Sequence, residues 1–258
     1  VRVTPSTGRP AARQVAAIRR RMASSRAATA LDGGTGSGEE EVMNRTDAEI
    51  LWEVASVLAR DAAKVSRAEG RVGPNLPPLL FFTDPGRTPR PWETAARLPP
   101  GCGVVFRHFG RADAHETALR LRDATRLRDG LLLIGLDAEL AEAVGADGVH
   151  LPEHALERAA SIAAARPDWR ITGAAHSPSA LDTPGLNAFV VSPVFPAGGA
   201  SAGKPPLGLR AFGERVEACY GPVYALGGID GGNAGELIGS GACGLAGVSA
   251  IQAAFGPD

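Results

Sequence analysis

Two turns near the end of the chain have the composition of an anion-binding site. One apolar run ends in Gly227-Gly228, and the next passes through Val248-Ser249 into a short helical segment. Glycine lets backbone N–H groups come close to an anion, and the N-terminus of a helix adds a favourable dipole. We therefore predict that these four residues bind a phosphate group. The alternative is that the glycines only form tight turns.

Three further side chains are candidates for contact with such a ligand. Arg107 ends an apolar run, and a guanidinium there can hold a phosphate or a carboxylate through two parallel hydrogen bonds. Lys204 lies in a loop of small residues, where it either meets the phosphate or is only solvated. His176 ends another apolar run and could act as a general base near neutral pH; the alternative is a hydrogen-bonded structural histidine.

The histidines are not spaced like metal ligands. His108, His115, His150, His154 and His176 are scattered along the chain, and carboxylates do not cluster with them. We therefore expect no metal site and no cofactor. His108 should point away from its neighbour Arg107, because adjacent residues of a strand face opposite sides. For His150 we expect a structural role.

Short apolar runs alternate with helical segments over most of the chain. A helix-like pattern covers 46–69, ahead of the first strand. Predicted strands cover 79–83, 103–109, 131–136, 148–151, 170–176, 188–194, 223–228 and 244–250. Predicted helices cover 114–128, 138–145, 154–166, 177–183, 207–219, 233–241 and 249–255.

This alternation predicts an α/β fold, a compact (β/α)8 TIM barrel over 79–255 with an N-terminal helical extension. A doubly wound open sheet would usually have a glycine-rich loop after its first strand, and 84–87 does not match one. In a TIM barrel the active site lies at the C-terminal ends of the strands. Since Arg107, His176 and the two glycine turns all end strands, the fold would bring them to one mouth.

The first part of the chain differs from the rest. Residues 1–45 are rich in arginine and poor in large apolar side chains, so we predict a disordered or non-native extension, followed by an N-terminal helical segment over 46–73. A transit peptide or a nucleic-acid-binding arm are the alternatives. The run Glu39-Glu40-Glu41-Val42 directly precedes Met43. Because glutamate codons resemble the purine-rich ribosome-binding sequence of bacteria, we hypothesise that translation begins at Met43.

The bulk composition excludes several classes of protein. The formal net charge of −1 provides no global attraction to nucleic acid or to a membrane surface. No apolar run is long enough to span a bilayer. Three cysteines without C-x-x-C spacing argue against a disulfide framework and favour a reducing compartment. We expect a cytoplasmic protein that binds a small-molecule phosphate, with no nucleic-acid or membrane partner; a homo-oligomer remains open.

Six phrases, in this order, resemble the thiamine phosphate synthase/TenI family. They are Leu80-Phe-Phe-Thr-Asp84, Val144-Gly-Ala-Asp-Gly-Val-His-Leu151, Gly173-Ala-Ala-His176-Ser177, Ser192-Pro-Val-Phe-Pro196, Ala225-Leu-Gly-Gly-Ile229 and Gly247-Val-Ser-Ala-Ile251. They span nearly all of 79–252. The resemblance implies a (β/α)8 barrel and a role in thiamine biosynthesis.

The resemblance also implies where this chain departs from the family. The family's synthases join hydroxymethylpyrimidine pyrophosphate to thiazole phosphate, with magnesium held by two aspartates. Those positions correspond here to Leu136 and Ala155, with Asp137 one place late. Only Arg107 remains of the family's Q-L-R-E-K motif. TenI-type members are thiazole tautomerases that need no metal, and their base corresponds to His176.

Three functions are therefore weighed against one another. The first is a TenI-like thiazole tautomerase in which His176 moves the proton. The second is a thiamine phosphate synthase with a magnesium site rebuilt from residues such as Asp137 and Glu153; magnesium-dependent release of pyrophosphate would favour it. The third is a non-catalytic or regulatory barrel, which would bind its phosphate ligand without turnover.

Overall fold

A computed structural model of the chain describes residues 45–68 and 75–257. The predicted extension over 1–45 therefore lies outside the described residues, apart from Arg45, as does the end of the predicted helical segment at 69–73.

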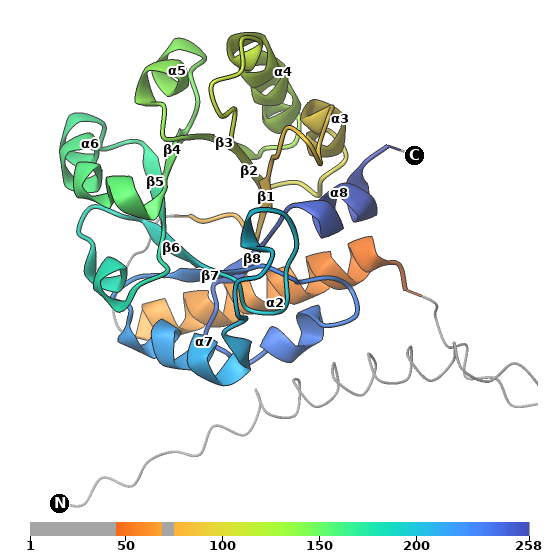
Figure 1. The fold of residues 1–258 in the computed structure, drawn as a ribbon, viewed down its shortest axis with the longest axis vertical. Coiled ribbons are helices and arrows are strands. Elements are labelled where there is room, and N and C mark those ends of the chain that lie inside the picture. Colours follow the sequence, from red (N-terminus) through yellow and green to blue (C-terminus); the bar gives the residue numbers. More distant parts are fainter. Residues whose placement is uncertain (1–44, 69–74, 258) are drawn as a thin grey trace, which may run out of the picture. The chain divides into compact units, whose positions relative to one another are not determined.

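The centre of the molecule is a closed barrel of eight parallel strands, in which each strand pairs with the next and β8 pairs with β1 (Figure 1). The predicted TIM barrel is confirmed. The strands are β1 (Leu79–Phe82), β2 (Gly103–Phe106), β3 (Leu131–Gly135), β4 (Gly148–Leu151), β5 (Arg170–Ala174), β6 (Ala188–Val191), β7 (Val223–Leu226) and β8 (Gly244–Gly247).

The strands are short runs of apolar residues because both faces of a parallel barrel strand are buried. Alternate residues fill the barrel interior, among them Phe82, Val105, Leu133, Val190 and Tyr224. The Tyr224 side chain is fully buried, and its hydroxyl donates to the carbonyl oxygen of Pro77 at 2.6 Å. This bond ties β7 to the chain that enters β1.

Helices of modest length connect the strands around the barrel. They are α3 (Pro91–Ala95), α4 (Ala114–Arg126), α5 (Ala138–Ala143), α6 (Ala159–Ala165), α7 (Gly208–Ala218) and α8 (Ser249–Phe255), with 3-10 turns η1 (Glu153–Arg158), η2 (Pro178–Asp182), η3 (Gly199–Ser201) and η4 (Ala234–Leu237). The predicted helices at 177–183 and 233–241 are thus only 3-10 turns, and α3 was not predicted.

Helix α2 (Asp47–Ala68) belongs to the same compact unit as the barrel. It packs against β8, β1, η4 and α8, and it buries Leu51, Val54 and Leu58 (Figure 1). The connection between β7 and β8 has η4 as its helical segment in place of a full helix, and its four residues are too few to cover the outside of β8. Helix α2 provides that cover from the outside of the barrel.

Two of the three cysteines are buried directly before strands. Cys102 precedes β2 and Cys243 precedes β8, at the end of the barrel opposite the C-terminal ends of the strands. Cys219, at the end of α7, is half-buried. No helix in the described part of the chain combines the length and the hydropathy needed to cross a membrane.

Candidate functional site

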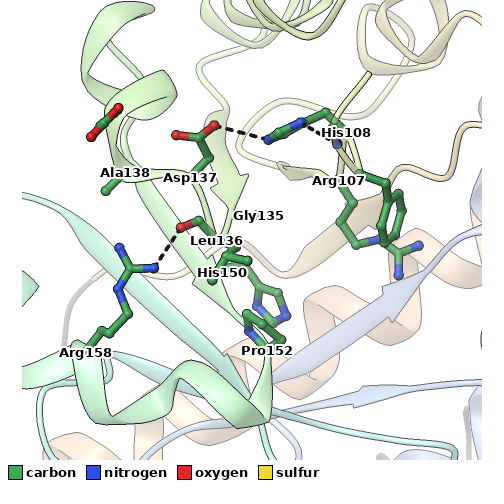
Figure 2. Close-up of a pocket in the computed structure, with 12 residues that line it drawn as sticks. Arg107, His108, Gly135, Leu136, Asp137, Ala138, His150, Pro152 and Arg158 are labelled. Atoms are coloured by element: carbon green, nitrogen blue, oxygen red, sulfur yellow. Dashed lines mark hydrogen bonds and ion pairs between the residues drawn. The ribbon is translucent and has the colours of Figure 1, made fainter. Parts of the chain in front are cut away.

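A cavity of about 570 Å³ opens at the C-terminal ends of β2, β3 and β4 (Figure 2). Its size suits a small organic ligand. Its apolar walls come from Phe109, Leu136 and Pro152, and the side chains of Arg107 and His150 also line it. The cavity therefore combines apolar walls with ionisable side chains, which also include Asp137, Glu139 and Arg158.

The Arg107 guanidinium lines this cavity with spare hydrogen-bonding capacity. Its Nε donates to the Thr83 carbonyl oxygen at 2.8 Å, and the rings of Phe82 and Phe109 lie 5.5 and 5.6 Å from its Cζ. Burial lowers the pKa of Arg107, and Asp84 opposes that shift. In the described part of the chain, Nη2 is buried without a hydrogen-bond partner. A buried cationic donor without a hydrogen-bond partner is unfavourable, and an anionic ligand that accepts from Nη2 would remove this cost.

His150 forms the floor of the same cavity as a neutral group. Burial lowers the pKa of His150 to about 3, and the nearby charges of Arg107 and His176 lower it further. Its Nδ1 lies 2.9 Å from Thr172 Oγ1, and its ring meets the Phe82 ring edge-on at 4.9 Å. The hydrogen bond agrees with the structural role expected for His150. His150 also lines the cavity, so a ligand bound there would lie next to its ring.

His176 lies exposed after β5, and its ring is oriented by a backbone carbonyl. Its Nδ1 is 3.2 Å from the Ser192 carbonyl oxygen. A carbonyl oxygen can only accept, so this contact favours the tautomer with the proton on Nδ1. That tautomer leaves a lone pair on Nε2, for which the described residues provide no partner. In that tautomer the imidazole could accept a proton at Nε2.

The backbone around His176 is held from both sides. Its N–H and that of Ser177 donate to the Glu153 carboxylate, while Arg215 Nη1 donates to the His176 carbonyl oxygen. Burial alone would raise the pKa of Glu153, but the hydrogen bonds from Ser177 and His176 lower it overall. Glu153 thus acts as a charged anchor for the loop that carries His176.

The two predicted phosphate-binding residues after β7 lie where only glycine fits. Gly227 and Gly228 have φ angles of 100° and 68°. A Cβ on Gly227 would lie 2.7 Å from Pro193 Cα, and one on Gly228 would lie 2.3 Å from the Pro196 carbonyl oxygen. The turn therefore packs tightly against the loop that follows β6. This packing agrees with the alternative that the glycines form a tight turn. It is also compatible with anion binding by the backbone of the turn.

The other predicted pair, Val248 and Ser249, begins α8. Val248 is the N-cap residue and supplies no side-chain hydrogen bond to the first turn. The Ser249 hydroxyl accepts a hydrogen bond at 3.3 Å from Nη1 of Arg87, a residue of the β1–α3 loop. Arg87 is not among the site residues predicted from the sequence. Its partner lies 162 residues away, so no local pattern could have revealed it.

The remaining predicted site residue, Lys204, is carried by a surface loop. It is exposed, and its side chain makes no hydrogen bond or ion pair with any described residue. It lies just after η3, in the loop between β6 and α7.

Comparison with known proteins identifies the family. A family model described as thiamine monophosphate synthase (TMP-TENI) matches residues 98–251. The chain belongs to the thiamine phosphate synthase/TenI family. The resemblance stated from the sequence is thereby confirmed, and with it a place in a family of thiamine biosynthesis.

Relatives of known name agree with this assignment. The thiamine-phosphate synthase of Chlorobium luteolum is 33% identical over 195 residues, which cover 72% of this chain and 90% of the relative. The bifunctional protein ThiM/ThiE of Symbiobacterium thermophilum is 30% identical over 92% of this chain. The thiamine-phosphate synthase of Gloeobacter violaceus is 36% identical over 55% of it. The chain spans only 55% and 42% of the last two relatives' lengths.

Among solved structures, the thiamine phosphate pyrophosphorylase of Pyrococcus furiosus has a similar fold. The TM-score is 0.58 at 24% sequence identity, and the match covers 70% of this chain and 93% of the other. At this identity the likeness supports the fold alone.

The two carboxylates suggested for a rebuilt magnesium site, Asp137 and Glu153, are both engaged by groups of the protein. The Asp137 carboxylate accepts from the Leu140 backbone N–H at 2.8 Å and lies 3.4 Å from His108 Nε2 (Figure 2). The Glu153 carboxylate is engaged by the His176 loop. In the described part of the chain, no three His, Cys, Asp or Glu side chains are grouped to hold a metal. Mg²⁺ is often held by one or two carboxylates together with substrate phosphates, so the site suggested at Asp137 and Glu153 stays a prediction.

Proposed function

We propose that this member of the family is a TenI-like thiazole tautomerase, with His176 as the base that moves the proton. The observation that carries the proposal is the orientation of the His176 ring. Its Nδ1 faces a carbonyl oxygen, and its Nε2 has no partner among the described residues. General-base catalysis needs an unprotonated, accessible nitrogen of this kind.

The chemistry requires only this one group to change its protonation state. The imidazole Nε2 accepts a proton from one atom of the thiazole phosphate carboxylate, and the resulting imidazolium returns a proton to another atom of the same molecule. The Ser192 carbonyl stabilises the imidazolium through Nδ1–H. Substrate and product have the same composition, so the reaction consumes no co-reactant.

In this proposal the phosphate of the ligand is bound by Gly227, Gly228, Val248 and Ser249. TIM barrels commonly bind phosphate at the loops after strands seven and eight. Arg107 supplies a further anion contact at the cavity. Lys204 could reach the ligand only by movement of the exposed loop that carries it.

Thiamine phosphate synthase activity is the second candidate, because several relatives of this chain carry that name. That activity would release pyrophosphate from a pyrimidine substrate. We rank it second because Asp137 and Glu153, the carboxylates suggested for its magnesium site, already accept hydrogen bonds within the protein.

The test uses the full chain in two measurements. Calorimetric titration with thiazole phosphate, with and without magnesium, measures binding. NMR of thiazole phosphate carboxylate follows turnover between its tautomers. We expect metal-independent binding in the micromolar range, and turnover that His176→Gln lowers at least about 100-fold while the Kd stays within about two-fold. His154→Gln, a change at an exposed histidine nearby, should leave both unchanged.

Other outcomes would decide against the proposal. Magnesium-dependent release of pyrophosphate from hydroxymethylpyrimidine pyrophosphate in the presence of thiazole phosphate would favour the synthase. Binding that survives His176→Gln, with no turnover by either protein, would indicate a non-catalytic barrel.

A further inference from the structure

One carboxylate at the barrel mouth is shared by two arginines. Asp84 Oδ2 lies 3.0 Å from Nη2 of Arg87 and 3.8 Å from Nη2 of Arg107. The hydrogen bond from Arg87 is the largest influence on the pKa of Asp84, and that pKa is lowered. A single ionised carboxylate balances only one of the two guanidinium groups. The trio therefore carries a net positive charge in the absence of ligand.

The two arginines face different parts of the mouth. Arg87 lies beside Ser249, with Nη1 3.3 Å from its hydroxyl oxygen. A Cβ added to Gly199 would lie 2.7 Å from Arg87 Cζ, so the β6–α7 loop closes directly over this guanidinium. Arg107 instead lines the cavity at β2–β4. Asp84 thus joins two separate places where an anion could be bound.

The charges around the cavity restrict the anion that Arg107 can take. Two carboxylates, Asp137 and Glu139, line the same cavity, while the cation Arg158 donates to the Leu136 carbonyl oxygen (Figure 2). With cations and carboxylates nearly balanced, a multiply charged diphosphate would be repelled by the carboxylates unless a metal neutralised it. A planar carboxylate carries a single charge and matches the guanidinium geometry.

We propose that the mouth selects a heterocyclic ligand with two anionic groups, whose phosphate is bound by Arg87 beside Ser249 and whose carboxylate is bound by Arg107. The inference rests on the proposed function and makes it more specific. Arg87 becomes a phosphate-binding residue, and Arg107 distinguishes carboxylated from decarboxylated thiazole phosphate. The apolar walls at Phe109, Leu136 and Pro152 would accommodate the ring near its carboxylate.

The experiment measures Kd by calorimetry for two probes, thiazole phosphate and thiazole phosphate carboxylate. A charged hydrogen-bonded contact is worth roughly ten-fold to 100-fold in affinity. We expect Arg107→Gln to weaken the carboxylated probe by about that factor and the other probe by less than about two-fold. Arg87→Gln should weaken both probes at least about ten-fold. Arg90→Gln, in the same loop and paired on the surface with Glu93, should change neither.

A second variant, Arg107→Lys, shows whether weaker binding by Arg107→Gln comes from the lost contact or from misfolding. Arg107→Lys keeps the charge and loses the planar fork, so it should weaken only the carboxylated probe, by less than Arg107→Gln does. Thermal unfolding of each variant checks that it is folded.

The outcomes separate this inference from the proposed function. Equal weakening of both probes by Arg107→Gln, or unchanged binding in Arg87→Gln, would overturn the inference while wild-type turnover left the tautomerase standing. If the wild-type chain bound neither probe, both would fall together.

Discussion

At the scale of single residues, the buried His150 makes stability depend on pH. Its pKa is about 3 in the folded chain, mainly because of burial, against about 6.5 for an unfolded histidine. Between these values the unfolded chain binds a proton that the folded chain does not. Stability should therefore fall as the pH falls through this window, and His150 should have no such effect above it.

The expected size is about 2 kcal/mol of unfolding free energy lost between pH 7 and pH 5 through His150 alone. Urea unfolding at the two pH values measures it, in wild type and in His150→Gln, which should lose this part of the pH dependence. His154→Gln, a change at an exposed histidine, is the control and should keep it. Equal pH dependence in all three proteins would show that folding does not lower the pKa of His150.

The residue scale also shows what local sequence could not predict about the site. Arg107, His176 and the glycine turns were predicted because each ends an apolar run, and a barrel brings such ends together. Arg87 was missed because its contacts with Ser249 and Gly199 join segments far apart in the chain. The tautomer of His176 likewise depends on a carbonyl from the next strand's loop.

At the scale of elements, helix α2 should stabilise the barrel by covering β8. Leu51 is only 2% exposed on its inner face, and Leu51→Ala should lower the free energy of unfolding by about 2 to 5 kcal/mol. Val65→Ala on the same helix is the control: Val65 is 58% exposed, so the expected change is below about 0.5 kcal/mol. Chemical denaturation measures both. A small effect of Leu51→Ala would mean that α2 is only loosely docked.

All eight strands were predicted, but most were predicted to extend too far at their C-terminal ends. Residues 107–109 were predicted to continue strand β2, but the strand ends at Phe106. The backbone of 107–109 no longer pairs with a neighbouring strand and instead forms part of the loop at the mouth of the barrel. Apolar composition reports burial and not strand pairing, so it could not mark these ends. Helix α3 was missed because Pro89 and Pro91 resemble a loop, although Pro91 occupies the first turn, where proline is tolerated.

At the scale of the whole molecule, Tyr224 links distant parts of the chain inside the barrel. Its hydroxyl satisfies the Pro77 carbonyl, 147 residues away. Tyr224→Phe would remove the donor and leave a buried acceptor unpaired, at a cost of about 1 to 3 kcal/mol. Tyr220→Phe is the matched control, since Tyr220 is 79% exposed. Urea unfolding of both variants tests this, and similar midpoints would indicate that water replaces the lost donor.

The burial of the thiols has a practical consequence for following the molecule in solution. Burial raises the pKa of Cys102 to about 12 and also raises the pKa of Cys243. The pKa of Cys219 is raised too, but this thiol is only half-buried. Since the thiolate is the reactive form, a maleimide should modify Cys219 first. Cys102 and Cys243 flank the paired strands β1, β2 and β8, where the barrel closes. The rates at which Cys102 and Cys243 are labelled would therefore measure how often the paired strands β1, β2 and β8 separate enough to expose these thiols.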